Sequence, residues 1–311
     1  MKMKNKFIFN SNSAFTTFSS HERGFTLIEL LVTIALLGIL AGGILIALNI
    51  GGTIDKASLT KAKKFAASLE NGLAISQVGK WSFEDADTSD TATDTSGYSN
   101  NGNLGGPDSC ITAIGLGACP TKLTASACEL GLGKCLSFDG TDDYVEIPNS
   151  PSTNFKTGDF TLSAWLKTNT TGASKGIIET ATVGFGELKS LRINDSAVSG
   201  KLTFFVRGAT GPDIQLDADV NINDNNWHHV VGVRNGTSFR LYKDGVLVKQ
   251  GSGDAGDTDT GTSWRIARTF DVSSYTSTLI DQVQIYSEAL TLSQIHQLHA
   301  EGLIRHALAF R

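Results

Sequence analysis

The 311-residue sequence has five prolines and four cysteines, and its 31 acidic residues outnumber its 26 basic ones. A net charge of −5 without a basic patch excludes the electrostatic footprint of nucleic-acid binding. The sequence lacks a Gly-x-Ser-x-Gly elbow, a His-Glu-x-x-His motif and paired acids at alternate positions of one strand, so we predict no enzymatic activity. Thirty-three glycines beside so few prolines favour a turn-rich all-β domain.

Charge is almost absent from an apolar run at residues 25–50, where Glu29 is the only ionisable side chain. A helix over this run would be about 39 Å long, which exceeds a hydrocarbon core of about 30 Å. A carboxylate inside such a helix costs about 2.5–3.5 kcal/mol, so it needs a partner. We predict a transmembrane helix over 25–50 in which Glu29 requires a partner.

The residues before this run differ from a secretory signal. They are polar and carry Lys2, Lys4, Lys6 and Arg23, and the small residue Gly24 precedes the apolar run instead of following it. Cleavage after Gly24 would remove residues 1–24 and leave the helix on the mature chain. The basic leader also keeps the N-terminus in the cytoplasm and sends everything after residue 50 across the membrane.

The segment from Arg23 to Leu30, Arg-Gly-Phe-Thr-Leu-Ile-Glu-Leu, resembles the leader junction of type IV pilins and pseudopilins. The resemblance implies cleavage between Gly24 and Phe25 by a membrane prepilin peptidase, followed by N-methylation of Phe25. It also implies that Glu29 pairs with the terminal amine of a neighbouring subunit. The expected location is the inner membrane, single-pass with the head outside, and an extracellular pilus or pseudopilus after assembly.

Residues 51–79 are predicted to continue this helix as an amphipathic segment. Apolar residues recur at helical spacing opposite a row of lysines, which we interpret as a solvated face. The apolar positions are Ile54, Ala62, Phe65, Ala66, Leu69 and Leu73, and the lysines are Lys56, Lys61, Lys63 and Lys64.

From residue 80 onward the pattern changes to short strands. Asn235-Gly236 and Asp244-Gly245 are strong signals for two-residue hairpin turns. The residues Phe160–Lys167 alternate as a half-buried strand should. The predicted strands are Phe160–Lys167, Lys201–Arg207, Trp227–Arg234, Ser238–Lys243, Val246–Gln250, Ser263–Ala267 and Leu279–Tyr286. The fold class is therefore α+β, a long N-terminal helix followed by an antiparallel β-sandwich.

Residues 80–303 also resemble a laminin-G-like, concanavalin-A-like jelly roll. The resemblance rests on Trp81–Glu84, Asp94–Gly97, Asn101-Gly102, Leu136–Val145, Trp227–Val231, Leu241–Gly245 and Ile280–Tyr286, in that order, before a closing helix at Leu292–His299. A C-terminal tail, 304–311, follows. The resemblance implies an extracellular module that binds a glycan or a protein.

The four cysteines, Cys110, Cys119, Cys128 and Cys135, fall within an insertion at residues 105–135. Their spacing lacks the Cys-x-x-Cys pairs of zinc sites. An even number outside the membrane favours two disulfides, with three pairings open, over buried thiols or a metal site. Because the stretch has little to bury, cross-links would supply much of its order.

The jelly-roll resemblance further implies a Ca²⁺ ion that ties the first strand to the last. The matching positions are Asp281, Asp139, Asp94 and Asn101, whose oxygens suit this ion. The alternative is that Asp139 and Asp94 only stabilise turns.

Other acids and histidines are assigned structural roles. We interpret Asp142 and Asp143 as a turn, followed by one exposed acid at Glu146. The Asp-rich loop at 253–261 lacks the EF-hand arrangement and is predicted to be exposed. His228 and His229 point to opposite faces of one strand, so one is expected to be packed and the other exposed.

Together these features predict a pilin-like, minor subunit of a type IV pilus or type II secretion pseudopilus that displays a lectin-like adhesive sandwich. The alternative is a membrane-anchored carbohydrate- or protein-binding module that does not polymerise. Trp264, Arg268 and Tyr275 are candidates for ligand contact, although core or scattered surface roles are favoured for them. Fold analogy alone supplies no ligand.

Overall fold

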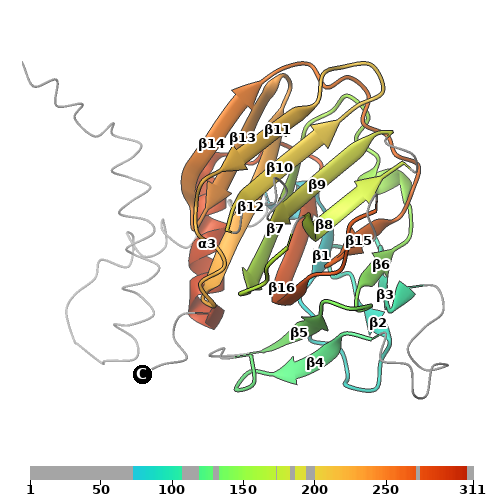
Figure 1. The fold of residues 1–311 in the computed structure, drawn as a ribbon. Helices are drawn as coiled ribbons and strands as arrows, with labels where there is room; N and C mark the ends of the chain where they lie inside the picture. Colours follow the sequence, from blue (N-terminus) through green and yellow to red (C-terminus); the bar gives the residue numbers. More distant parts are fainter. Residues whose placement is uncertain are drawn as a thin grey trace, which may run out of the picture. The chain divides into compact units, whose positions relative to one another are not determined.

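The computed structural model describes residues 73–106, 119–128, 133–172, 174–182, 186–193, 200–270 and 274–306. The predicted leader and transmembrane helix lie outside these ranges. Within them the chain forms two antiparallel sheets that pack face to face as a β-sandwich (Figure 1). The antiparallel sandwich predicted from strand periodicity is therefore confirmed.

The first sheet contains eight strands and includes both the first and the last strand of the sandwich. Its order is β14 (Val246–Ser252), β13 (Ser238–Lys243), β12 (Trp227–Asn235), β7 (Phe160–Lys167), β16 (Ser277–Tyr286), β5 (Lys134–Asp139) and β4 (Thr121–Thr124), and β1 (Gln77–Trp81) also pairs with β16.

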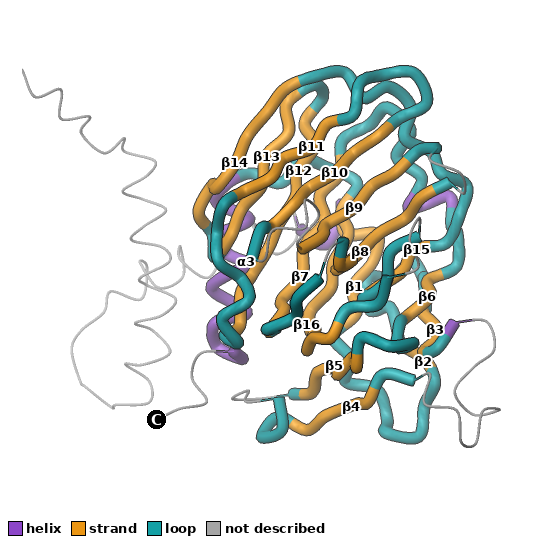
Figure 2. The backbone as a smooth tube through the Cα atoms, viewed as in Figure 1, coloured by secondary structure: helices purple, strands orange, loops and turns teal. Residues whose placement is uncertain are grey.

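The second sheet also has eight strands, and it carries the arginine-rich surface described below. Its order is β11 (Ile214–Ala218), β10 (Leu202–Arg207), β9 (Leu188–Ile193), β8 (Lys175–Ala181), β15 (Trp264–Ile266), β6 (Val145–Ile147), β3 (Gly102–Leu104) and β2 (Thr91–Ala92). A short 3₁₀ turn, η2 (Pro151–Thr153), follows β6, and helix α3 (Leu292–His306) closes the chain (Figure 2).

The core lies between the two sheets. Large side chains from both layers meet there, including Trp81, Phe160, Phe204 and Trp264, each at most 1 % exposed. The rings of Phe160 and Phe204 pack edge to face at 6.0 Å. Trp264, a candidate for ligand contact in the sequence, is thus a core residue.

The outer face of the first sheet is also covered. Leu73 and residues of α3 pack there against side chains of β12, β13 and β16, and the shared cluster is Leu73, Val231, Val233, Tyr242, Tyr286, Leu290, Ile295 and Leu298. Every residue of β7 is therefore buried. The prediction that Phe160–Lys167 is half-buried is wrong, because strand periodicity does not reveal a helix that packs on the outer face.

The entry into the sandwich differs slightly from the predicted boundary. Residues 73–76 are helical, and β1 begins at Gln77, three residues before the boundary predicted at residue 80. Helix α3 extends to His306, beyond the predicted end of the domain at 303. The pairing of β1 with β16 explains the early strand, since Gln77 lies opposite Tyr286.

The two hairpin signals have different outcomes. Lys243 pairs with Val246, so Asp244 and Gly245 form the predicted two-residue turn, with φ values of 52° and 77°. Asn235 instead pairs with Ser238, which places the second turn at Gly236 and Thr237, one residue later than predicted.

One predicted disulfide is present in the described part of the insertion. Cys128 and Cys135 are bonded, with their Cα atoms 6.1 Å apart, and both are fully buried. Cys119 is also disulfide-bonded, and Cys110 lies outside the described residues. The Trp227 indole donates a 3.0 Å hydrogen bond to the Cys128 carbonyl, which ties the cross-linked loop to β12.

Candidate functional site

The residues predicted to act in processing and assembly, Gly24, Phe25 and Glu29, lie outside the described residues, and their roles stay predictions. None of the helices within the described ranges has the length and apolar character needed to cross a membrane. The predicted span at 25–50 falls outside those ranges.

Two of the four predicted calcium ligands lie together in the loop that precedes β3. The Asp94 carboxylate accepts hydrogen bonds of 2.8–2.9 Å from the backbone nitrogens of Lys80, Ser96 and Asn100. Asn101 Oδ1 accepts from the Asp94 nitrogen at 2.9 Å. These bonds match the turn-forming alternative for Asp94.

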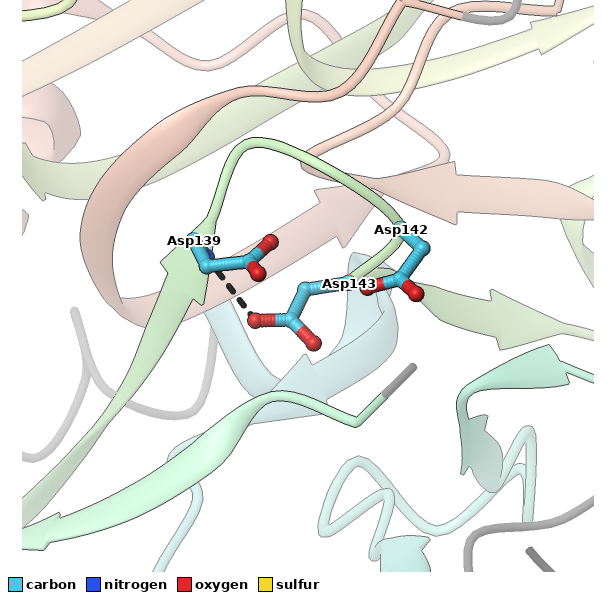
Figure 3. Close-up of side chains that lie close together, drawn as sticks. All are labelled: Asp139, Asp142 and Asp143. Atoms are coloured by element: carbon cyan, nitrogen blue, oxygen red, sulfur yellow. Dashed lines mark hydrogen bonds between the residues drawn. The ribbon is translucent and has the colours of Figure 1, made fainter. Parts of the chain in front are cut away.

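The other two predicted ligands lie in different places. Asp281 is fully buried on β16, where its Oδ1 accepts a 2.7 Å hydrogen bond from the Gln282 nitrogen. Asp139 ends β5 and meets Asp142 and Asp143 instead (Figure 3). Carboxylate oxygens of these three residues all lie within 4.8 Å of one another. We call Asp139, Asp142 and Asp143 the aspartate cluster.

The aspartate cluster is organised around Asp143, which is only 4 % exposed. Its Oδ2 accepts a 2.8 Å hydrogen bond from the Asp139 nitrogen (Figure 3), while its Oδ1 is buried without a hydrogen-bond partner. Oδ1 of Asp142 is also buried and unpartnered. Burial raises the pKa of the Asp143 carboxyl to about 6, and the charges of Asp139 and Asp142 act in the same direction.

This arrangement fits a hard divalent cation. Two oxygens that bind one Ca²⁺ at about 2.3–2.6 Å are at most about 5 Å apart, so the spacing of the cluster is suitable. Orphaned carboxylate oxygens are costly when buried, and a cation would satisfy them. Sequence reasoning assigned Asp142 and Asp143 to a turn, and missed the burial of Asp143 because the loop folds back on β5.

Both histidines of β12 are buried, so the expectation that one would be exposed is wrong. His228 lies between two carboxylates, with Nδ1 2.8 Å from Asp244 and Nε2 3.0 Å from Asp224. His229 stacks on Trp165 beneath α3, with ring centroids 5.2 Å apart. Desolvation lowers the pKa of His229 to about 3.

The Asp-rich loop at 253–261 is not simply an exposed loop. Ala255 and Thr258 are fully buried within it. The carbonyl of Thr258 accepts a hydrogen bond from the Lys189 ammonium, and that of Gly256 accepts one of 3.1 Å from Arg234. Burial lowers the pKa of Lys189 to about 8. The loop therefore provides acceptors for two cations of the core.

The outer face of the second sheet carries arginines stacked on aromatic rings. On β10, Phe204 points into the core, so Phe205 points outward. The guanidinium carbons of Arg207 and Arg192 lie 5.1 and 5.7 Å from the Phe205 ring centroid. We call the whole set the arginine–aromatic face: Arg192, Arg207, Arg265, Arg268, Phe205, Phe270, Tyr144 and Tyr275.

The two arginines beside Phe205 have carboxylate partners. Arg192 Nε lies 2.7 Å from Glu179 Oε2, and both side chains are almost completely buried. Arg207 Nη2 lies 2.6 Å from Asp213 Oδ2 in a more exposed position. Sequence periodicity gave no signal for this face, because its members come from five separate segments of the chain.

A family model described as the concanavalin A-like lectin/glucanases superfamily matches residues 139–296, just over half of the chain. The chain therefore belongs to this superfamily. A second model, the prokaryotic N-terminal methylation motif, matches residues 19–45. Both resemblances identified in the sequence are confirmed. No protein of curated function matches the chain by sequence.

Solved structures with a similar fold include binding domains of larger proteins. The binding domain of Paraclostridial Mosquitocidal Protein 1 superposes with a TM-score of 0.56 at 17 % identity, covering 73 % of this chain and 52 % of that one. Domain 4 of AbnA, an extracellular arabinanase from Geobacillus stearothermophilus, solved with arabinotriose, gives 0.54 at 19 %, covering 72 % and 98 %. The chain thus spans about half the length of the first of these structures, and the likeness concerns the fold.

Proposed function

We propose that this protein is a pilin-like subunit, minor in abundance, whose concanavalin A-like head binds carbohydrate outside the cell without catalysis. One observation carries the proposal: a prepilin-type methylation motif at residues 19–45 and a lectin-superfamily domain at 139–296 occur in the same chain. The first supports insertion into a type IV pilus or a secretion pseudopilus. The second supports recognition of a sugar by the displayed head.

Glu29→Ala is expected to reduce incorporation into filaments at least tenfold, because the acid would no longer pair with the methylated amine of a neighbouring Phe25. Incorporation is measured by immunoblotting of sheared filaments against the membrane fraction. Mass spectrometry of the wild-type protein should find a mature N-terminus at methylated Phe25. Glu22→Ala is the matched control, since cleavage removes that residue before assembly.

If Glu29→Ala enters filaments as efficiently as the wild type, the assembly role is wrong. If the wild type is processed but never found in filaments, the protein is instead a membrane-anchored binding module that does not polymerise. Binding by the head is tested separately on a glycan array with the full-length chain in detergent. If the oligosaccharide recovered from the protein after binding is intact, the head binds the sugar without cleaving it.

We also propose that the aspartate cluster binds Ca²⁺ within this head. The ion would neutralise Asp139, Asp142 and Asp143 and hold together the loop between β5 and β6. The buried, unpartnered oxygens of Asp142 and Asp143 support this site over the Asp94 loop, whose carboxylate is already hydrogen-bonded.

Asp143→Asn is expected to abolish stabilisation by Ca²⁺, which for the wild type is about 2.7 kcal/mol at a hundredfold excess over the dissociation constant. In a chelator the variant should be more stable than the wild type by about 1–3 kcal/mol, because a buried charge beside two carboxylates is removed. Thermal unfolding of the full chain is followed by tryptophan fluorescence, since all four tryptophans lie in the head.

Asp94→Asn serves as the comparison, because Asp94 belongs to the other predicted calcium position. It should weaken the fold without changing the response to Ca²⁺. Loss of the response in Asp94→Asn, together with its retention in Asp143→Asn, would assign the ion to the loop before β3 instead.

A further inference from the structure

Arg268 lies between two tyrosine rings at one end of the arginine–aromatic face. Its guanidinium carbon is 4.7 Å from the ring centroid of Tyr144 and 4.9 Å from that of Tyr275. The two rings meet edge to face at 6.1 Å. Within the described residues Arg268 has no ion pair, and its Nε is buried without a hydrogen-bond partner. The side chain is held by stacking alone and remains partly exposed.

A second guanidinium lies beside the first. Arg265 stacks on Phe270 at 3.6 Å and lies 5.9 Å from the Tyr144 ring. Its Nε is also buried without a hydrogen bond, and the Glu146 carboxylate stays 3.7 Å away. Desolvation lowers the pKa of Arg265, and the positive charge of Arg268 lowers it further.

The positive charge at this end of the arginine–aromatic face is not balanced by carboxylates. Glu146 is the only carboxylate in the described structure that forms an ion pair with either guanidinium. Lys175 adds a third cation, because its ammonium donates to the Tyr275 carbonyl at 2.8 Å and to Ser274 Oγ at 3.0 Å, both uncharged oxygens. Arg192 and Arg207, by contrast, each have a carboxylate within 2.7 Å.

The Tyr144 ring beside Arg268 is packed closely against the backbone. A Cβ atom on Gly106 would lie 1.9 Å from the Tyr144 hydroxyl, so glycine at this position allows the ring to sit against the backbone. The backbone of Tyr275 pairs with that of Arg268 in an isolated antiparallel bridge, which keeps the two residues side by side. A guanidinium with fixed orientation binds a planar anion through two parallel hydrogen bonds, and adjacent rings provide apolar contact.

We infer that Arg268 and Arg265, enclosed by Tyr144, Tyr275 and Phe270, form a subsite for the carboxylate or sulfate group of an acidic saccharide. This inference rests on the proposed carbohydrate-binding function and specifies its ligand class. The Arg268 guanidinium, which has no ion pair within the described residues, binds the anion together with Arg265, and the partly exposed Tyr275 ring contacts the adjoining sugar ring. Because the attraction is ionic and partly exposed, affinity falls as salt concentration rises.

The test compares matched saccharides by isothermal titration calorimetry on the full-length protein in detergent. The probes are a trimer of galacturonic acid, the corresponding trimer of galactose, and galactose oligomers carrying sulfate esters. An acidic probe should bind at least tenfold more tightly than the neutral trimer. Whether the carboxylated or the sulfated form binds better identifies the anion.

Arg268→Gln should weaken binding of the acidic probe at least tenfold, and Arg268→Lys should weaken it by less. Arg207→Gln is the matched control: it removes an arginine from the same face, one that already has a carboxylate partner, and should change affinity less than threefold. Tyr275→Leu removes a ring without changing charge and should also weaken binding. Thermal unfolding verifies that each variant is folded.

Equal affinity for acidic and neutral trimers, or unchanged acidic binding in a folded Arg268→Gln variant, overturns the inference and leaves carbohydrate binding intact. Failure of every acidic and neutral saccharide to bind, in the calorimeter and on the glycan array, overturns carbohydrate binding by the head as well.

Discussion

Glu179→Ala is expected to lower the free energy of unfolding by about 3–5 kcal/mol, because it removes the buried carboxylate that pairs with the buried charge of Arg192. Glu179 is fully buried and receives three hydrogen bonds of 2.7 Å, from Arg192 Nε, Ser190 Oγ and the Phe270 nitrogen. The substitution would leave the Ser190 hydroxyl and the Phe270 nitrogen without this acceptor, while Arg192 Nε keeps its 3.0 Å hydrogen bond to Ser190 Oγ. Chemical denaturation followed by tryptophan fluorescence measures the loss.

Asp213→Ala provides the control for this prediction. Arg207 and Asp213 form the same kind of pair, at 2.6 Å and against the same Phe205 ring, but the Asp213 side chain is 47 % exposed. Exposed ion pairs contribute about 0–1 kcal/mol, so its removal should cost no more than that. Equal losses in the two variants would contradict the argument that burial decides the cost.

Acidification from pH 6.5 towards 3 is expected to reduce the free energy of unfolding through His229, by up to about 4 kcal/mol in total. Its folded-state pKa of about 3 lies below the unfolded value of 6.5, so the unfolded chain binds the proton first as the pH falls. The stabilisation is complete above pH 6.5 and is lost progressively below it. His299, which stacks 5.8 Å away, has a lowered pKa and acts in the same direction.

His229→Gln should therefore flatten the loss of stability between pH 6.5 and 4, at some cost in stability at neutral pH from altered stacking with Trp165. His228→Gln should leave the slope below pH 6.5 almost unchanged. Desolvation lowers the pKa of His228, but the hydrogen bond and charge of Asp244 outweigh it, and the net shift is upward. The stabilisation by protonated His228 is fully present below pH 6.5 and is lost as the pH rises through its folded-state pKa, so removing His228 lowers stability at acid pH without steepening the decline. Identical slopes in the two variants would refute this account.

The strands of the sandwich could be predicted because their periodicity is local. Phe160–Lys167 and Ser238–Lys243 have the predicted bounds, and the Asp244-Gly245 turn forms where expected. Burial on the outer face of the first sheet could not be predicted in the same way. It depends on α3, whose residues are more than 100 positions from β7 in the chain, and the sequence of β7 alone does not indicate this cover.

The candidate sites were predicted only in part, for a related reason. Asp139 was identified from its motif, yet the burial of Asp143 depends on how the loop after β5 folds back. Arg268 and Tyr275 were noted as possible ligand contacts, whereas Tyr144 and Arg265 were not. Antiparallel pairing of β6 with β15 brings Tyr144 and Arg265 together. This pairing joins strands that are far apart in the chain, so it cannot be predicted from local sequence patterns.

The position of β1 has a mechanical consequence for a head that is held by its N-terminal side. Tension transmitted through residue 73 reaches the sandwich at β1, which pairs with β16. The hydrogen bond from the Ser287 nitrogen to the Ser76 carbonyl, 2.8 Å long, is among the first bonds loaded. The pulling force thus enters the sheet opposite the one that carries the arginine–aromatic face, so the strands of the proposed saccharide subsite are not the first to separate under load.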